Sequence, residues 1–259
     1  MRNDPGPQDA RLPEGMGGLA KGLAIIEAFS PQRTRLTVSE AAECAGTSRA
    51  SARRCLLTLT ELGYLEYDGK FYRPQPRLLS LGNRQLATRS LPEIAQPFLV
   101  TARDDLHESV SLAVLDGDTA LFVARAEAER LVMTGISVGT RMDLYCSATG
   151  RVLLSGQSDD QVDAYLDRAK LKARTKLTLT RKSALQEIIR HARARGYATT
   201  DQELELGLRS IALPVRNSRG TLVAAISASA SSARVTLQQM IRSFLPVLRE
   251  KAIDLGRAL

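Results

Sequence analysis

The sequence contains little histidine and little cysteine. Its 259 residues include two histidines, His107 and His191, and three cysteines, Cys44, Cys55 and Cys146. The histidines lie far apart, and an odd number of cysteines without metal-ligand spacing indicates neither a zinc site nor a disulfide framework. The scarcity of histidine also weighs against hydrolases that need a histidine base. We therefore predict no metal site and no catalytic residues.

Long apolar runs are lacking as well. No segment approaches the 18 consecutive apolar residues of a membrane span, and the start of the chain lacks the charged and apolar regions of a secretory signal. We therefore expect a cytoplasmic protein that does not cross a membrane. Residues 1–17 are rich in proline and glycine without apolar periodicity, which predicts a disordered tail.

Positive charge is in excess, with a formal net charge of +8, which suggests an anionic partner such as nucleic acid. The excess is uneven: residues 1–77 carry 11 basic and 9 acidic residues, whereas residues 167–195 carry 10 and 2. The second segment could be a nucleic-acid patch, but a polar run of this kind is more often a solvated loop and helix face. We do not assign it to DNA.

Three short helices are expected after the tail. Apolar residues at helical spacing up to Phe29 indicate the first helix. Thr37 and Glu40 have the spacing of a capping box at the start of the second helix, and Thr47 or Ser48 caps the third. The close succession of the second and third helices is typical of a helix-turn-helix.

The third helix has the composition of a recognition helix. Its first two turns combine small hydroxyl residues with arginines, which suit guanine edges and phosphates, while its apolar residues follow from Cys55 onward. An Asp68-Gly69 turn between aromatic strands then predicts a hairpin, which would be the wing. The alternative is a surface helix with unrelated arginines. The predicted DNA-binding residues are Thr47, Ser48, Arg49, Ser51, Arg53, Arg54, Lys70 and Arg73.

Residues 78–90 form an amphipathic segment that predicts a linker helix, whose leucines need a partner such as the matching helix of a second subunit. The remaining chain alternates between helical and period-two patterns, which predicts an α/β domain with a mainly antiparallel sheet. Expected strands cover residues 110–114, 121–124, 132–137, 210–215 and 221–230. Expected helices cover residues 92–107, 149–156, 159–168 and 183–195, with a last helix from about Thr236.

Several segments together resemble the IclR-type transcriptional regulators, from about Gly18 onward. The resemblance rests on the winged-helix sequence, on Ser147 to Leu154, on Asp201 to Glu205 and on Gly207 to Val215. The combination of Val138 to Arg141, Tyr145-Cys146 and Gly207 to Ser210 makes the chain most similar to the branch that regulates protocatechuate and 4-hydroxybenzoate breakdown through the β-ketoadipate pathway.

This resemblance implies an α+β chain with a winged helix-turn-helix at residues 18–77, a linker helix at 78–90 and an effector domain with a GAF- or profilin-like sheet at 91–259. It also implies a homodimer or tetramer on a palindromic operator, and an effector pocket between the sheet and the helix that begins around Thr149. No cofactor is implied. The pocket residues carried over are Leu131, Ala148, Thr149, Asp201, Arg209, Ile211, Ser227 and Ser229.

The residues themselves partly support an acid-binding pocket. A helix amino end and the hydroxyl of Thr149 favour a carboxylate. Arg209 could hold the same carboxylate by two hydrogen bonds, or it could pair with a nearby glutamate, Glu203 or Glu205. The serines 227 and 229 point to one strand face and could bind a ring hydroxyl, or they are merely small sheet residues.

Three functions remain to be weighed. The first is a DNA-binding transcriptional regulator that a small organic, aromatic acid of the protocatechuate or 4-hydroxybenzoate type switches. The second is an enzyme acting on a small aromatic or keto acid, although no nucleophile pair, metal motif or phosphate-binding loop is present. The third is a DNA-coating protein, which would not need polar residues buried in the second domain. We predict the first.

Overall fold

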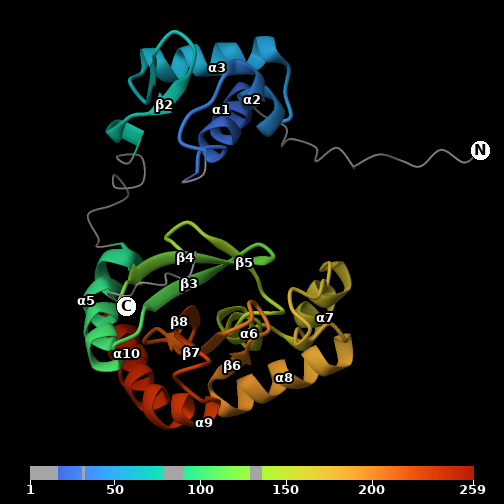
Figure 1. Ribbon diagram of the computed structural model, residues 1–259, viewed down its shortest axis with the longest axis vertical. Helices are drawn as coiled ribbons and strands as arrows, with labels where there is room; N and C mark the ends of the chain where they lie inside the picture. Colours follow the sequence, from blue (N-terminus) through green and yellow to red (C-terminus); the bar gives the residue numbers. More distant parts are fainter. Residues whose placement is uncertain (1–16, 31–32, 79–89, 129–135) are drawn as a thin grey trace, which may run out of the picture. The chain divides into compact units, whose positions relative to one another are not determined.

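The computed structural model describes residues 17–30, 33–78, 90–128 and 136–259. The chain divides into two compact units, residues 1–88 and 89–259 (Figure 1). Each unit is described by itself. The predicted linker helix at 78–90 and the predicted tail at 1–17 lie almost entirely outside the described residues.

The amino-terminal unit contains three helices followed by a hairpin. Thr37 and Glu40 form the expected capping box at the start of α2, and Ser48 rather than Thr47 caps α3. The hairpin pairs Tyr67 with Tyr72 across the expected turn. The elements are α1 (Gly17–Glu27), α2 (Val38–Cys44), α3 (Arg49–Glu61), β1 (Leu65–Tyr67), β2 (Tyr72–Pro74) and a 3₁₀ turn, η1 (Pro76–Leu78).

A small apolar core holds this unit together. Ile25 from α1, Leu56 from α3 and Tyr72 from β2 are buried in one cluster. Leu36 joins them, and its backbone exchanges hydrogen bonds with Tyr72, so the segment before α2 pairs with the hairpin. This pairing makes the wing part of the folded unit rather than a free loop.

The carboxy-terminal unit is built on one six-stranded antiparallel sheet with the order β5-β4-β3-β8-β7-β6. Its strands are β3 (Val110–Asp116), β4 (Thr119–Ala126), β5 (Arg141–Asp143), β6 (Ala198–Asp201), β7 (Leu208–Arg216) and β8 (Leu222–Ser231). Its helices are α5 (Leu91–Leu106), α6 (Ala148–Ser155), α7 (Asp159–Arg168), α8 (Lys182–Arg195), α9 (Leu237–Gln239), the π-helix η2 (Met240–Phe244) and α10 (Leu245–Ala258).

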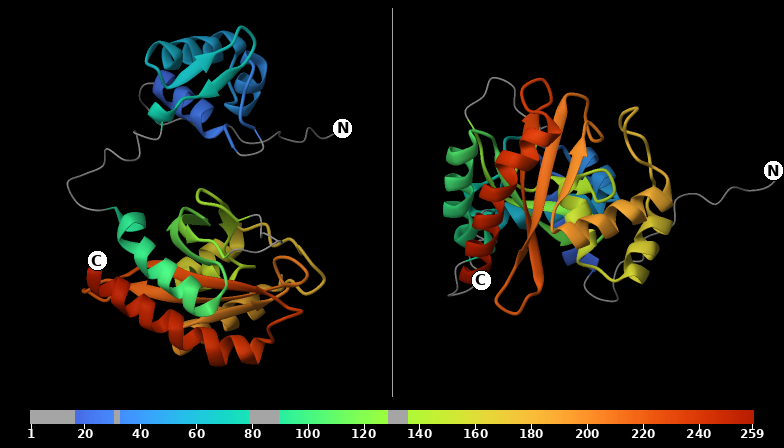
Figure 2. Two further views of the ribbon diagram at one scale, coloured as in Figure 1. Left: turned by 60° about the vertical axis from the view of Figure 1, so that its left-hand side comes forward. Right: turned by 90° about the horizontal axis from the view of Figure 1, so that it is seen from below.

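Helices cover both faces of this sheet, as Figures 1 and 2 show. Helices α5 and α10 pack on one face, where residues such as Leu99 and Leu248 form one apolar core with the sheet. Helices α6, α7 and α8 cover the other face around a second core. Within the described residues, no helix is long and apolar enough to cross a membrane.

Strand alternation decides which face each residue serves. On β8, Ile226 and Ala228 belong to the core beneath α5 and α10, whereas Ser227 and Ser229 face α6. Because Ser227 pairs with Ser111 on β3 and Ser229 with Ser210 on β7, hydroxyl groups line up across neighbouring strands on the α6 face.

Two strands depart from the sequence expectation. The described residues 136–137 are not in a strand, and a short strand instead follows at Arg141–Asp143; the rest of the expected strand, at 132–135, lies outside the described residues. The edge strand β6, which we did not predict, is only four residues long. A strand this short gives little periodic pattern, so its position depends on pairing with β7.

Helix α6 approaches the preceding chain very closely at Gly150. A Cβ atom at this position would lie 2.3 Å from the Cα atom and 2.4 Å from the carbonyl oxygen of Leu144. The turn before α6 is held by Tyr145, whose amide donates to the buried Tyr165 hydroxyl at 3.2 Å. Burial raises the pKa of Tyr165 to about 12, so this hydroxyl stays neutral.

A buried ion pair fixes α6 to the β6–β7 turn. Arg151 is fully buried, and its guanidinium donates to both carboxylate oxygens of Glu203, at 2.7 and 2.5 Å. Its Nε donates to the Tyr145 carbonyl at 3.0 Å, and the Leu179 amide donates to Glu203 at 3.2 Å. Every charged atom of the pair therefore has a partner, which is the condition for tolerating buried charge.

We expect Gly150→Ala to destabilise the carboxy-terminal unit by about 1–3 kcal/mol or more, because backbone atoms of Leu144 cannot move aside easily. The melting temperature, followed by circular dichroism, should fall by several degrees. Gly22→Ala on α1 is the matched control, since a Cβ there meets nothing within 4 Å and alanine favours helices. Equal melting temperatures of the two variants would contradict the close approach of Gly150 to Leu144.

We expect Arg151→Met to cost about 3–5 kcal/mol, because it leaves Glu203 buried without its counter-charge. The double variant Arg151→Met, Glu203→Leu should be less destabilised than Arg151→Met alone, since both charges are then gone. Urea unfolding midpoints of the wild type, both single variants and the double variant measure this. Strictly additive losses would show that the two side chains are not energetically coupled.

Candidate functional site

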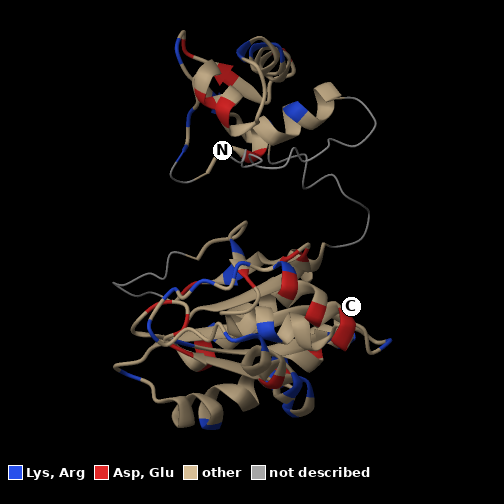
Figure 3. Ribbon diagram, turned by 90° about the vertical axis from the view of Figure 1, so that its right-hand side faces the viewer, with Lys and Arg blue, Asp and Glu red and all other residues tan. Residues whose placement is uncertain are grey.

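The first candidate site is the exposed side of α3. Ser48 accepts a hydrogen bond from the Ser51 amide at 3.3 Å, which starts the helix where the hydroxyl and arginine residues gather. The arginines 49, 53 and 54 are exposed, and Thr47 and Ser51 are half-buried. Figure 3 shows where the basic and acidic residues lie along the ribbon. Four of the predicted DNA-binding residues thus stand free on one short segment, with Ala52 and Leu56 anchoring the opposite side in the core.

The wing supplies the other two predicted residues. Asp68 accepts hydrogen bonds from the amides of Lys70 and Phe71, at 3.0 and 2.7 Å, and these bonds lower the pKa of its carboxyl group. Lys70 is exposed at the turn, and Arg73 lies 3.1 Å from the Asp68 carboxylate. The turn therefore stays ordered while it presents positive charge.

Arg35 is a basic residue beside the wing that sequence reasoning missed. Its guanidinium lies 4.2 Å from the centre of the Phe71 ring, a cation–π distance, and the residue is exposed. It reaches the wing because Leu36 pairs with Tyr72. The sequence gives no signal for this pairing, since Arg35 lies in an irregular segment 30 positions before the start of the hairpin at Leu65.

The second candidate site is a small cavity in the carboxy-terminal unit, between the sheet and the first turn of α6. Its volume is about 20 Å³, which is room for roughly one water molecule. One side of the lining is apolar and the other is rich in hydroxyl groups. The lining residues are Ser111, Phe122, Ile136, Met142, Ser147, Ala148, Thr149, Thr200, Leu204, Ser210, Ser227 and Ser229.

Four predicted pocket residues border this cavity: Ala148 and Thr149 at the start of α6, and Ser227 and Ser229 on β8. The structure thus brings together the helix end and the strand that the sequence analysis paired. Leu131 lies outside the described residues.

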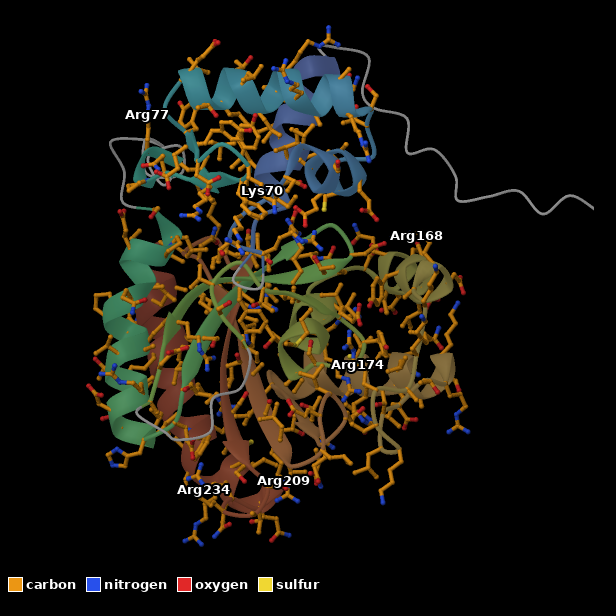
Figure 4. All side chains as sticks on the ribbon, turned by 45° about the horizontal axis from the view of Figure 1, so that its top comes forward. Lys70, Arg77, Arg168, Arg174, Arg209 and Arg234 are labelled. Atoms are coloured by element: carbon orange, nitrogen blue, oxygen red, sulfur yellow. The ribbon has the colours of Figure 1, made fainter. Side chains whose placement is uncertain are left out.

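Three other predicted pocket residues lie on the opposite side of the sheet. Ile211 is buried in the core beneath α5 and α10. Arg209 binds the carboxylate of Asp201, with Nε–Oδ1 at 2.8 Å, and donates to the carbonyls of Ser232 and Val235. Figure 4 shows Arg209 near Arg234 at one end of the unit. Arg209 thus forms an ion pair, as the alternative reading expected, but with Asp201 rather than with a glutamate.

Sequence reasoning missed the hydroxyl residues on the neighbouring strands. Ser111 on β3, Thr200 on β6 and Ser210 on β7 all border the cavity. Ser210 and Ser229 are hydrogen-bonded to each other at 2.8 Å. Side chains alternate between the two faces of β7, so Ser210 lies on the face opposite to that of its neighbours Arg209 and Ile211. The sequence does not show which of these faces lines the cavity, and we chose the wrong one.

None of the residues that line the cavity carries a charged side chain. Positive potential reaches it from the amino end of α6, where Ser147 caps the Gly150 amide at 3.0 Å and the helix dipole is directed toward the opening. Its lining combines backbone donors at the helix end, hydroxyl groups on the sheet and apolar side chains, which is the chemistry that suits a small acid with a hydroxylated ring, although the cavity as it stands has room for about one water molecule only. It contains no nucleophile-base pair, and no metal-binding cluster occurs in the described part of the chain.

Four of the ten basic residues in the segment 167–195, all of which the structure describes, form surface ion pairs. Arg168 binds Asp118 at 2.9 Å, Arg174 binds Asp143 at 2.6 Å and Lys182 binds Asp167 at 2.5 Å. Figure 4 shows Arg168 and Arg174 on the side of the unit that α7 and α8 cover. These pairs place part of the segment on a solvated, ion-paired surface and leave several of its basic residues exposed.

Comparisons with known proteins cover both units. Two family descriptions match: "IclR helix-turn-helix domain" over residues 18–69 and "Bacterial transcriptional regulator IclR C-terminal" over residues 84–257. The Pca regulon regulatory protein of Pseudomonas putida is 42% identical over 244 residues, covering 94% of this chain and 84% of that protein. The p-hydroxybenzoate hydroxylase transcriptional activator of Acinetobacter baylyi is 35% identical over 253 residues, covering 96% and 93%.

Solved structures agree. A transcriptional regulator from Rhodococcus sp. RHA1 matches with a TM-score of 0.83 and 41% identity, covering 93% of this chain and 97% of that one. An IclR homolog from Microbacterium hydrocarbonoxydans, solved with 4-hydroxybenzoate, matches with a TM-score of 0.83 and 25% identity, covering 92% and 97%. These findings confirm the predicted family and fold class and favour a regulator over an enzyme. The chain belongs to the IclR family of bacterial transcriptional regulators.

Proposed function

We propose that this regulator binds an operator through α3 and the wing, and that a small aromatic acid of the hydroxybenzoate type, bound between the sheet and α6, switches this binding. The observation that carries the proposal is the lining of the cavity. It combines the amino end of α6, serine and threonine hydroxyls on the sheet, and apolar side chains. A helix end suits a carboxylate, and paired hydroxyls suit a ring hydroxyl.

The relatives support this effector class. The regulators of Pseudomonas putida and Acinetobacter baylyi are named for the pca regulon and for p-hydroxybenzoate hydroxylase, and the Microbacterium hydrocarbonoxydans structure holds 4-hydroxybenzoate. Both 4-hydroxybenzoate and protocatechuate combine one carboxylate with ring hydroxyls. The proposed site consists of Ala148, Thr149, Ser227 and Ser229 together with Ser111, Thr200 and Ser210.

We propose that residues 18–77 are the DNA-binding domain and residues 91–259 the effector domain, joined by residues 78–90. The proposed assembly is a homodimer or tetramer, because a palindromic operator presents two equivalent half-sites. The proposed location is the cytoplasm. Leu19 and Leu23 on α1 are 62% and 50% exposed and offer apolar surface for such an assembly.

We expect Arg53→Ala to weaken operator binding about 5- to 150-fold, because an arginine that reads a base edge contributes about 1–3 kcal/mol. Effector affinity should stay unchanged, since Arg53 belongs to the other unit. The operator is first selected from a random pool of duplex DNA with the wild-type protein, and Kd is then measured at several salt concentrations.

Lys176→Ala is the matched control, because it removes the same charge from an exposed position in the basic segment 167–195. Operator affinity and its salt dependence should be those of the wild type. If Lys176→Ala weakens binding as much as Arg53→Ala, the basic segment is a second DNA contact and the DNA-binding face is incomplete as assigned.

We expect Ser227→Ala to weaken the binding of 4-hydroxybenzoate about 3- to 10-fold in isothermal titration calorimetry, because the site loses one hydrogen bond and keeps its size. Operator affinity without ligand should not change. Ser218→Ala, in the exposed β7–β8 turn, is the control and should bind the acid normally. An unchanged affinity in Ser227→Ala would mean that this serine is only a small sheet residue.

A further inference from the structure

Two buried guanidinium groups lie behind the wall of the cavity. Arg151 is committed to Glu203 and to the Tyr145 carbonyl, so its donors point away from the cavity. Arg125 on β4 is the other one, and its side chain is only 7% exposed. Its Nη1 donates to the hydroxyl of Ser111 at 2.8 Å, and Ser111 borders the cavity.

The strand register explains this contact. Ser111 on β3 pairs with Arg125 on one side and with Ser227 on the other, so the three side chains lie in one row on the α6 face of the sheet. The Arg125 backbone is held as well, because the Gln96 side chain of α5 donates to its carbonyl at 3.2 Å. The guanidinium also donates through Nε to Glu127, a half-exposed residue, at 3.1 Å.

The bond to Arg125 fixes the polarity of the Ser111 hydroxyl. A guanidinium can only donate, so the Ser111 oxygen must accept, and its own hydrogen is left to donate elsewhere. Within the described residues, the Ser111 side chain takes part in one hydrogen bond, the one that it accepts from Arg125. A hydroxyl polarised by a permanent cation is a stronger donor, and the cavity lies in front of it.

The small size of the cavity places this donor close to the helix end. Ser111, Ala148 and Thr149 all border a space of about one water molecule, so an oxygen atom there faces both the Ser111 hydroxyl and the first turn of α6. The hydrogen-bonded pair Ser210 and Ser229 lies on the next strands of the sheet. Anion-binding donors and ring-hydroxyl partners are therefore separated along the sheet.

We propose that Arg125 is the positioning residue of the effector site: it orients and polarises Ser111 to donate to the carboxylate of the acid. The inference deepens the proposed function and rests on it. The carboxylate then lies toward β3 and the α6 start, and the ring hydroxyl lies toward the Ser210–Ser229 pair. This arrangement makes the site selective for an acid over its neutral amide, because a carboxylate accepts a stronger hydrogen bond from the polarised Ser111 hydroxyl than an amide oxygen does.

The test compares 4-hydroxybenzoate with 4-hydroxybenzamide in isothermal titration calorimetry on the full chain. Arg125→Met and Ser111→Ala should each lose about 10-fold or more in acid affinity, with amide affinity nearly unchanged. Arg125→Lys, which keeps the charge, should recover part of the loss. Operator binding without ligand serves as the folding check.

Arg209→Met is the matched control, because Arg209 is also a largely buried, ion-paired arginine of the same sheet, on the opposite face. It should leave the ratio of acid to amide affinity unchanged. If Arg125→Met does not fold, the ratio measured for Ser111→Ala decides the question.

Equal losses for acid and amide in Arg125→Met and Ser111→Ala would reduce Arg125 to a structural role and overturn the proposal. So would a selective loss of acid binding in Arg209→Met alone. In both cases the wild type still binds the acid, and the proposed function stands. A wild type that binds no hydroxybenzoate would overturn the proposed function together with this inference.

Discussion

The buried pair of Arg151 and Glu203 is the interaction on which the functional face of the carboxy-terminal unit depends. It joins Arg151 of α6 to Glu203 of the β6–β7 turn, which lie 52 positions apart in the sequence, and both elements contribute residues to the lining of the cavity. Thr149 lies two positions before Arg151, and Leu204 directly follows Glu203. Because a buried charge cannot be left without its partner, the pair sets the spacing of α6 and the β6–β7 turn.

Local signals predicted the amino-terminal unit in detail because its structure is encoded over short distances. The Thr37 and Glu40 capping box, the Ser48 cap and the turn at Asp68-Gly69 each involve residues within four positions of one another. Such patterns can be read directly from a sequence. Arg35 shows the limit, because its place beside Phe71 depends on a backbone pairing with a distant strand.

The cavity was predicted in its outline but not in its full lining. Helix capping and the serine spacing on β8 pointed to the helix and the strand that border the cavity, yet a change of one residue in strand register moves every side chain to the other face. On β7 the alternation of side chains places Ser210 toward α6 and leaves Arg209 and Ile211 on the side of α5 and α10. The pairing of Ser111 with Arg125 is even harder to predict from the sequence, because the register of β3 and β4 shifts between Leu112 and Ala113.

The close packing around the cavity also explains how a small acid could act as a switch. A space for one water molecule cannot admit a benzene ring, so the ring fits only a wider state of the cavity, in which α6 or the side chains that line the cavity have moved. Gly150 against Leu144 and the ion pair of Arg151 hold the narrow state. A ligand shifts an equilibrium only by its difference in affinity for two states, and a ring excluded from the narrow state has the largest difference available. An acid whose ring fits only the wider state therefore shifts the effector domain toward that state.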